Sequence, residues 1–323
     1  MKLVHKNYLL ITVFTLVGFL IGYLLHPSQT NIFKEIRNQE GYTFINPLLE
    51  CEYNFNPQSQ KNTQNIKNEI STFINQSLED KNIFAASIYF RDLNNGPSFG
   101  INEEELFSPA SLLKVPLMIA YFKETEHSPG VLQQSILFDQ PINQQEQNIK
   151  PEKELIIGEE YSIEELIKRM IIYSDNEAYE LLINNIDIKN YEKIFTDLGI
   201  DISLAKNNPG GNIINIKDYA SFFRILYNAS YLNKEMSEQA LDLLSQSTYK
   251  KGLVKPLPKD LLVAHKFGER NYLTSQDKQL HDCGIIYLLN KPYLLCIMSK
   301  GSDFDLLSKF IQNTSHIVYK HLI

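Results

Sequence analysis

Cysteine is scarce in this sequence, which has 3 among its 323 residues: Cys51, Cys283 and Cys296. Their wide spacing excludes a metal knuckle, and an odd number argues against a disulfide framework, so we interpret them as structural. A basic stripe is also missing, and the net charge is −7. Without clustered lysine and arginine to replace counterions along a phosphate backbone, nucleic acid is excluded as a partner.

The chain also lacks internal repeats, low-complexity tracts, a GxSxG elbow and an HExxH zinc helix. The last two absences exclude two common routes to hydrolysis, and we expect neither a metal nor a cofactor. Apolar residues make up 43% of the sequence and charged residues 21%. This balance predicts a globular protein with a sizeable core.

Charge is absent from Tyr8 to Leu25, a run just long enough to cross a bilayer as a helix. Lys2 and Lys6 precede it, which favours a cytoplasmic tail at residues 1–7 and an extracytoplasmic remainder, in the periplasm or at the cell surface. A cleaved secretory signal is the alternative, but no small-x-small cleavage site follows the run. We therefore expect a membrane-anchored protein with a transmembrane segment over residues 8–25.

Residues 26–63 are mixed and polar, with one apolar island from Tyr42 to Leu49. They predict a tether that touches the folded body once. A helix is predicted from Ile66 to Leu78, where apolar residues recur at intervals of three and four. Ile83 to Asp92 and Ser98 to Ile101 then predict two strands joined by a turn.

Strand signals fade after Pro109, and helical periodicity continues to about Ser247. Ser162 begins a capping box, and further helices are predicted at about Asn176 to Ile186 and Asn215 to Tyr227. The C-terminal part predicts strands at Leu261 to Phe267, Gly284 to Leu289 and Tyr293 to Met298, then a helix from Phe304 to His321.

Strands at both ends of a helical block predict an α/β plus all-α fold with two lobes in a domain over residues 64–323. The α/β lobe combines residues 64–108 and 255–323 in an antiparallel sheet flanked by helices. The all-α lobe is inserted between them as residues 109–254. A ligand site is expected where the two lobes meet.

Ser111 is a candidate nucleophile because it lies in the first turn of a predicted helix, with Ser108 as N-cap and Pro109 as the first helical residue. Free backbone N–H groups there favour developing negative charge. Lys114 lies three residues on, on the same helical face. In a dry cleft its amine loses part of its preference for the charged form and can accept the serine proton.

The serine-to-lysine spacing is weak evidence by itself, because Ser203, Ser247 and Ser275 have it too. Two further motifs add to it. Ser174-Asp175-Asn176 lies between helical segments and by itself is typical of a helix cap. Lys266-Phe267-Gly268 ends a predicted strand, whereas its decoy Lys250-Lys251-Gly252 lies outside any strand pattern.

The order SxxK, SDN, KxG resembles the class A β-lactamase and penicillin-binding protein families. The resemblance covers roughly Gln64 to Ile323, and the stretch from His281 to Asp303 is similar to the last two strands of the family. It implies a class A β-lactamase-like two-lobe fold. It also implies serine acyl transfer, through an acyl-enzyme, on a β-lactam or a D-alanyl peptide of the cell wall.

The resemblance implies three catalytic residues. Ser111 would attack a carbonyl and become acylated, Lys114 would accept its proton, and Ser174 would relay a proton to the departing nitrogen. Asp175, in the same motif, is interpreted as structural.

The resemblance also implies a substrate-binding set. Asn176 would hydrogen-bond the side-chain amide of the substrate, and Lys266 would hold its carboxylate. The backbone N–H of Glu269, just after Gly268, would form the oxyanion hole together with that of Ser111.

The sequence departs from the family pattern in two ways. Phe267 stands where the family has a hydroxyl-bearing residue, which removes one hydrogen bond to the substrate carboxylate. The ExxLN glutamate, which primes the hydrolytic water in class A β-lactamases, has no counterpart between Asn176 and Asn215. The nearest match, Glu180 to Asn184, falls inside the helix that follows Ser174, too early for that loop. We therefore expect slow deacylation.

Other candidate residues carry less weight. Glu192, Asp197 and Asp201 are more typical of surface charge, and His265 and Tyr173 are more typical of packing. A non-catalytic, membrane-tethered module that binds cell wall or peptide is the alternative function. Retention of all three motifs counts against it.

Overall fold

The computed structural model describes residues 16–18, 34–37, 39, 41–52, 57–94, 97–142, 147–203, 211–272 and 277–323. Apart from residues 16–18, the predicted anchor from Tyr8 to Leu25 lies outside these ranges, as does Ser275. Within them, no helix combines the length and the apolar character needed to span a bilayer.

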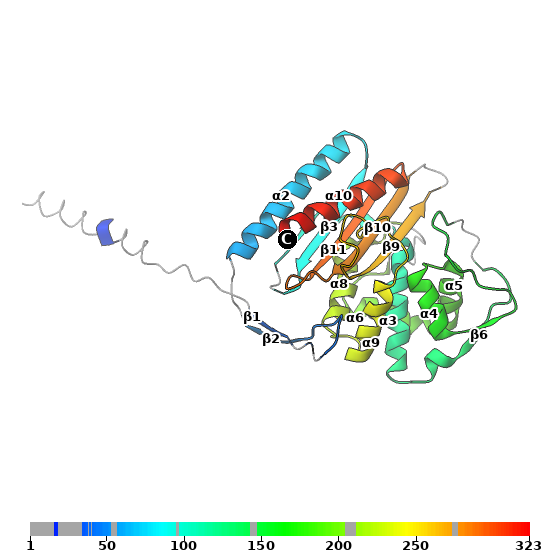
Figure 1. The fold of residues 1–323 in the computed structure, drawn as a ribbon. Helices are drawn as coiled ribbons and strands as arrows, with labels where there is room; N and C mark the ends of the chain where they lie inside the picture. Colours follow the sequence, from blue (N-terminus) through cyan, green and yellow to red (C-terminus); the bar gives the residue numbers. More distant parts are fainter. Residues whose placement is uncertain are drawn as a thin grey trace, which may run out of the picture.

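A five-stranded antiparallel sheet is built from both ends of the domain, as the sequence predicts. Its order is β4-β3-β11-β10-β9 (Figure 1). Two strands come from the N-terminal part of the domain and three from the C-terminal part. The bounds are β3 Ala85–Asp92, β4 Ser98–Ile101, β9 Val263–Asn271, β10 Lys278–Ile286 and β11 Tyr293–Gly301.

Strand β10 begins at Lys278, earlier than the Gly284 that its apolar run predicts. The difference arises because Gln279, His281 and Asp282 are polar yet fully buried. Each has hydrogen-bond partners, which offset the cost of removing it from water. Cys283 pairs with Cys296 across β10 and β11 in a disulfide that the cysteine count does not predict.

Two helices cover one face of the sheet, α2 (Pro57–Glu79) and α10 (Phe304–Leu322), and lie side by side in Figure 1. Of the apolar positions of α2 that recur at intervals of three and four, Ile66, Ile70 and Ile74 are buried and Phe73 is partly buried, whereas Leu78 near the end of the helix is exposed. Phe73 stacks on Phe310 between the two helices at 5.3 Å. In β3, Ile88 and Phe90 join this core, whereas Tyr89 joins the core of the other face.

An all-helical lobe covers the other face of the sheet, which confirms the predicted two-lobe class. Helix α3 (Lys114–Thr125) is its centre, because every residue from Lys114 to Phe122 is buried. The helices around it are α4 Ile163–Ile172, α5 Asn176–Asn185, α6 Ile188–Asp197, α8 Ile216–Tyr227 and α9 Lys234–Ser245. Ser162 caps α4 as predicted, by accepting a hydrogen bond from the Glu165 N–H at 3.1 Å.

Two short antiparallel ribbons are not predicted from the sequence. Leu106–Phe107 (β5) pairs with Ile214–Asn215 (β8), and Ser135–Leu137 (β6) pairs with Glu160–Ser162 (β7). Strands of two or three residues are too short to give a period-two pattern. The β5–β8 pair joins the segment before Ser108 to the segment before α8.

A segment ahead of α2 docks on the folded body, at the apolar island that the sequence predicts as a contact. Lys34–Arg37 (β1) pairs with Leu48–Glu52 (β2), and the stretch from Tyr42 to Asn46 between them, here called the clasp, packs on the helical lobe. Helix α2 begins at Pro57, within the predicted tether.

The clasp is held by one carboxylate and two apolar side chains. Glu238 on α9 accepts hydrogen bonds from the backbone N–H groups of Thr43, Phe44 and Ile45 at 2.6 to 3.1 Å. Phe44 is 8% exposed and Ile45 is fully buried. The ring of Phe44 meets Tyr287, at the end of β10, edge to face at 5.5 Å. The clasp therefore contacts both lobes.

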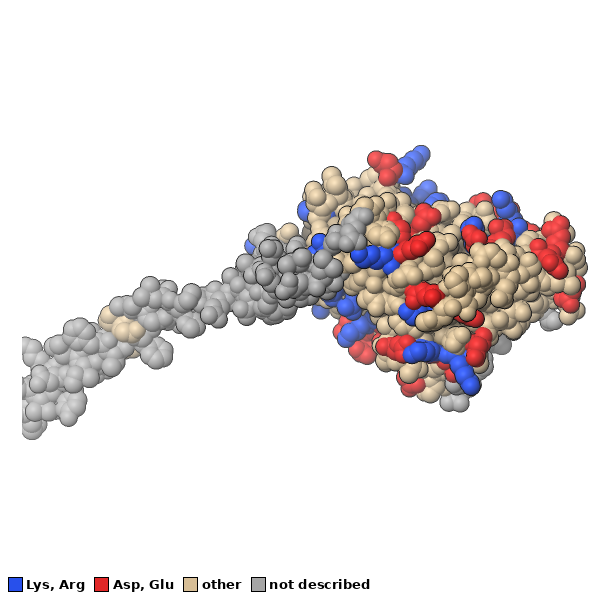
Figure 2. Space-filling model, turned by 90° about the horizontal axis from the view of Figure 1, so that it is seen from below, with Lys and Arg blue, Asp and Glu red and all other residues tan. Residues whose placement is uncertain are grey.

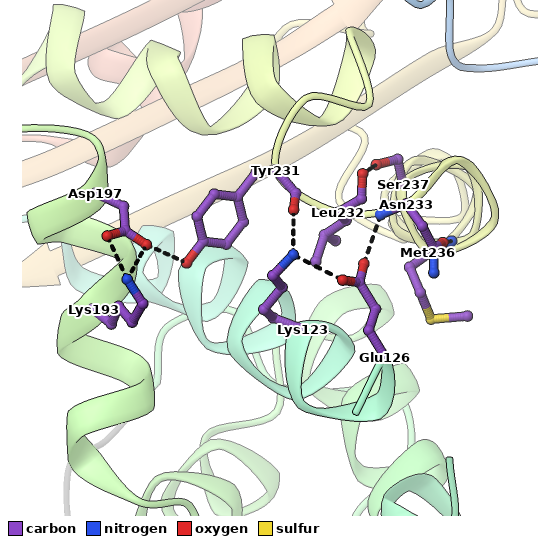
Figure 3. A network of polar contacts seen from close by, with 9 residues as sticks. All are labelled: Lys123, Glu126, Lys193, Asp197, Tyr231, Leu232, Asn233, Met236 and Ser237. Atoms are coloured by element: carbon purple, nitrogen blue, oxygen red, sulfur yellow. Dashed lines mark hydrogen bonds and ion pairs between the residues drawn. The ribbon is translucent and has the colours of Figure 1, made fainter. Parts of the chain in front are cut away.

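A polar network joins α3, α6 and the turn before α9 (Figure 3). Lys123 Nζ donates to the Tyr231 carbonyl at 2.7 Å and to Glu126 at 2.8 Å. The Tyr231 hydroxyl donates to Asp197, which also pairs with Lys193. These contacts assign Asp197 to the surface. Figure 2 shows positive and negative side chains interspersed over one face of the molecule.

We predict that the clasp contributes measurably to stability. Deleting residues 1–27 should leave a soluble, folded protein, because no described core residue lies before the clasp. Deleting residues 1–56 should lower the free energy of unfolding by about 3 to 6 kcal/mol, the scale for two buried apolar side chains. Glu238→Ala should lower it by about 1 to 3 kcal/mol, with Glu235→Ala on the exposed face of α9 as the control. Denaturant melts measure each value, and equal stability of the two truncations would contradict the prediction.

Candidate active site

Ser111 lies in a 3₁₀ turn, Ala110–Leu113 (η1), that runs directly into α3 at Lys114. The predicted cap is wrong: Pro109 occupies the N-cap position, and no side chain caps the turn. Lys114 is the first residue of α3, three residues after Ser111. The two residues therefore lie on the same face where the helix begins.

Buried groups fix the chain just before this turn. The N–H of Ser108 donates to Gln279 Oε1 at 3.0 Å, and Nε2 of His281 donates to the Ser108 carbonyl at 2.9 Å. The other ring nitrogen of His281 accepts from the Ser299 N–H, and burial lowers its pKa to about 4. A neutral imidazole thus bridges two backbones. Tyr219 donates to the Leu112 carbonyl at 3.2 Å.

Gly268 on β9 explains why a glycine ends the third motif. A Cβ at this position would lie 2.9 Å from the Pro109 carbonyl oxygen and 3.0 Å from Leu112 Cγ. Any side chain would push the strand away from the turn that carries Ser111. The glycine therefore sets the distance between the strand and the candidate nucleophile.

The Lys114 amine is buried at the centre of the site. It donates to the Ser174 carbonyl at 2.6 Å, to Asn176 Oδ1 at 2.6 Å and to Ser174 Oγ at 3.2 Å. Among the described contacts of this amine, none goes to Ser111 Oγ. Burial lowers the pKa of Lys114 from 10.5 to about 7, against the opposing charges of nearby carboxylates. A substantial fraction of this lysine is therefore neutral near pH 7.

A second lysine reaches the same hydroxyl from the strand side. Lys266 Nζ is fully buried and donates to Ser174 Oγ at 2.8 Å and to the Phe267 carbonyl at 3.0 Å. It also lies 4.3 Å from the centre of the Phe267 ring, where the π face attracts a cation. Burial lowers the pKa of Lys266 well below its usual value, and the charge of Lys114 lowers it further.

Phe267 has an additional role in packing. Its ring stacks on Tyr249 at 4.1 Å and is 3% exposed. The apolar residue in the third motif thus fills a core position and gives Lys266 a π surface, where a hydroxyl would give a hydrogen bond.

Ser174 is held in a left-handed backbone conformation, with φ of 57°. Asp175 then caps α5 by accepting from the Glu177 and Ala178 N–H groups at 2.9 and 3.2 Å. Ala110, next to Ser111, also has a positive φ of 46°. Such conformations cost about 1 to 3 kcal/mol each and persist where the surroundings impose them. Both flank the candidate chemistry.

Three carboxylates act electrostatically on Lys114, namely Asp175, Glu269 and Glu180, in decreasing order. Glu192, Asp197 and Asp201 are not among them. Asp197 belongs to the surface network described above, and Asp201 accepts a hydrogen bond from the backbone N–H of Ser203. Residues 204–210, which include part of the stretch Asn207 to Asn212, lie outside the described residues.

Two residues near the site carry no sequence signal. Gln147 donates from its side chain to the Ser174 carbonyl at 3.1 Å. The Ile149 N–H donates to Glu269 Oε1 at 3.0 Å. The segment that holds Gln147 and Ile149 thus contacts the site on two sides, at Ser174 and at Glu269 on β9. Neither spacing nor composition distinguishes these two residues.

The other sequence candidates lie away from the convergence on Ser174. Ser203 is exposed and Ser247 is buried. His265 faces away from Lys266 along the strand and pairs with Asp282 at 2.9 Å, with both side chains fully buried. Tyr173 is the C-cap of α4, and Lys153 lies over its ring at 5.8 Å.

The sequence profile of the Beta-lactamase enzyme family matches residues 65–322. No match was found among curated proteins. Among solved structures, an extended-spectrum β-lactamase, TLA-3, is similar at a TM-score of 0.70 and 21% identity, covering 80% of this chain and 99% of the other. A class A β-lactamase from Mycobacterium abscessus gives 0.67 and 19%, with coverages of 80% and 99%.

A third similar structure is a mutant of PBP-A, described as an acyl-enzyme complex with penicillin G. Its TM-score is 0.66 and its identity 22%, covering 80% of this chain and 96% of the other. At these identities the likeness shows a shared fold, and it extends over the domain that carries the three motifs.

We predict that acylation of Ser111 requires neutral Lys114. Because the pKa of Lys114 is about 7, the acylation rate should rise about tenfold per pH unit below that value and level off above it. The measurement is the second-order rate of labelling by a fluorescent acyl donor between about pH 5 and pH 9. Lys114→Ala should slow labelling by about 100-fold or more. Lys168→Ala, on the outer face of α4, should change neither the rate nor the profile. A labelling rate that continues to rise up to about pH 10, the ordinary range for the pKa of lysine, would contradict the assignment.

Proposed function

We propose, from the premise that this chain belongs to the β-lactamase enzyme family, that it acts as a serine hydrolase through an acyl-enzyme on Ser111. Its substrates would be β-lactams or D-alanyl peptides of the cell wall. The observation that carries the proposal is the convergence of Lys114 and Lys266 on the Ser174 hydroxyl, at 3.2 and 2.8 Å, beside the turn that bears Ser111.

Acylation follows from this arrangement. A neutral Lys114 amine has two N–H donors and one lone pair, so it keeps at most two of its three hydrogen bonds and can turn its lone pair toward the Ser111 hydroxyl on the same helical face. Ser111 Oγ attacks the amide carbonyl as Lys114 takes its proton. The C–N bond breaks as the departing nitrogen takes a proton through Ser174 Oγ, which both lysines contact.

Substrate binding would use the strand side of the site. A carboxylate next to the reacting amide would lie near Lys266 and favour its charged form, which burial disfavours in the free protein. Phe267 offers no hydroxyl to that carboxylate, so recognition depends on the charge of Lys266. The backbone N–H groups of Ser111 and Glu269 would hold the oxyanion, and Asn176 would bind the side-chain amide.

Slow deacylation is the second part of the proposal. The chain lacks the ExxLN glutamate, and the carboxylates of α6 and the turn after it do not act on Lys114. Losing a general base typically costs about 100- to 10,000-fold in rate. The acyl-enzyme should therefore accumulate.

We also propose that the catalytic domain is extracytoplasmic and membrane-tethered. The support is the uncharged run from Tyr8 to Leu25 with Lys2 and Lys6 before it. A substrate in the cell wall would be accessible from that side of the membrane.

We predict that a fluorescent penicillin labels Ser111 and no other residue. Peptide mapping should place the label there, and Ser111→Ala should abolish it, with Ser203→Ala and Ser247→Ala as matched controls that keep it. Intact mass should show a long-lived penicilloyl adduct, and hydrolysis of a chromogenic cephalosporin should show a burst followed by a slow phase.

Each part of this prediction has its own contradicting outcome. Label that survives Ser111→Ala would refute the nucleophile. Fast steady hydrolysis with no burst and no detectable adduct would refute slow deacylation. Failure to label with any activated acyl donor would favour the non-catalytic binding module.

A further inference from the structure

Glu180 lies in the second turn of α5, one turn after Asn176. Residues four apart lie on one face of a helix, about 5 to 6 Å apart between Cβ atoms. The Asn176 side chain accepts a hydrogen bond from Lys114 at 2.6 Å, so this face of α5 is turned toward the Lys114 amine. Glu180 therefore projects from the same face, beside the site.

The charges of the site show the same proximity. Glu180 is one of the three carboxylates whose charge favours protonated Lys114, and Lys114 in turn acts on Glu180. Partial burial and the neighbouring charge of Glu177 raise the pKa of Glu180 above its usual value. A carboxylate with a raised pKa is a better proton acceptor than a fully solvated one.

Glu180 also differs from the other carboxylates near Lys114 in what its oxygens contact. Oδ1 of Asp175 caps α5, and Oε1 of Glu269 accepts from the Ile149 N–H on the other side of the site, while the second oxygen of each carboxylate is buried without a hydrogen-bond partner. Glu177, on the same helix, accepts from the Ile142 N–H at 2.8 Å. Among the described residues, the Glu180 carboxylate has no hydrogen-bond or ion-pair partner, and it is half-buried rather than sealed from water.

We propose that Glu180 is the general base for hydrolysis of the acyl-enzyme, a role that rests on the proposed function of Ser111. A water held between Glu180 and the ester carbonyl gives one proton to the carboxylate as its oxygen forms a bond to the carbonyl carbon. The tetrahedral intermediate then collapses and the bond to Ser111 Oγ breaks. The proton returns from Glu180 to Ser111 Oγ by way of the Lys114 amine, which releases the acid product and restores the free site.

The proposal also accounts for slow rather than absent turnover. Glu180 extends from a helix whose position is set by the Asp175 cap and by the contacts of Asn176. Its carboxylate therefore cannot move toward the ester as a residue on a loop could. A base fixed at the edge of the site positions the hydrolytic water less precisely than a loop glutamate directed at the ester. Hydrolysis is therefore slow, because the reactive geometry forms only rarely.

The experiment follows the penicilloyl adduct on the full-length protein by intact mass, after excess penicillin is removed. Glu180→Gln should form the adduct at a rate within about 3-fold of the wild type, because acylation uses Lys114. Its adduct should then persist about 10-fold longer or more, the lower part of the range for a lost base. Glu180→Asp, which shortens the carboxylate by one methylene, should fall between the two.

The matched control is Glu177→Gln, the same change one turn earlier on α5. Its adduct should decay within about 3-fold of the wild type, because Glu177 is bound to a backbone N–H and because burial, rather than the charge of Glu177, is the larger cause of the raised pKa of Glu180. An adduct on Glu180→Gln that decays at the wild-type rate would overturn the proposal while leaving the nucleophile intact. The proposal would also be overturned if Glu180→Gln failed to form the adduct while the wild type and Glu177→Gln formed it. Absence of any adduct on the wild type would defeat the function of Ser111 and this role together.

Discussion

Two buried lysine amines share one serine hydroxyl, and the rest of the site is arranged around that constraint. Lys114 and Lys266 both donate to Ser174 Oγ, and neither side chain is more than 2% exposed. Two ammonium groups so close, with so little water, repel one another and lose hydration. The arrangement is therefore stable only if one amine readily gives up its proton. Burial lowers the pKa of both amines, that of Lys114, beside the turn that carries Ser111, to about 7 and that of Lys266 well below its usual value.

The fold supplies these two amines from parts of the chain that are far apart in sequence. Lys114 starts the central helix of the all-α lobe, and Lys266 lies on the edge strand of a sheet that both ends of the domain build. Gly268 lets that strand approach the turn of Ser111. Asp282 on β10, buried beside His265, adds a negative charge that favours protonated Lys266. The left-handed backbone at Ala110 and Ser174 shows that packing overrides local preference here.

The sequence predicts the two-lobe architecture well, because long amphipathic helices and apolar strands have clear periods. Its apolar periodicity does not predict the first half of β10, whose buried polar residues interrupt that pattern, or the short ribbons around the helical lobe. Its three motifs predict that one site contains Lys114, Ser174, Asn176 and Lys266. It misses Gln147, whose contact depends on how a loop folds back, and it dismisses Glu180, since only the orientation of α5 shows which face of that helix meets Lys114.

The most direct test of this account is the proton equilibrium of Lys114 itself. NMR titration of protein carrying ¹³C-labelled lysine, with Lys114→Arg to assign the signal, measures it without substrate. The account predicts that, besides the lowered resonance of Lys266, a lysine resonance titrates at about 7 and disappears in the variant. It would be contradicted if the resonance of Lys114 titrated near the ordinary value of about 10.4.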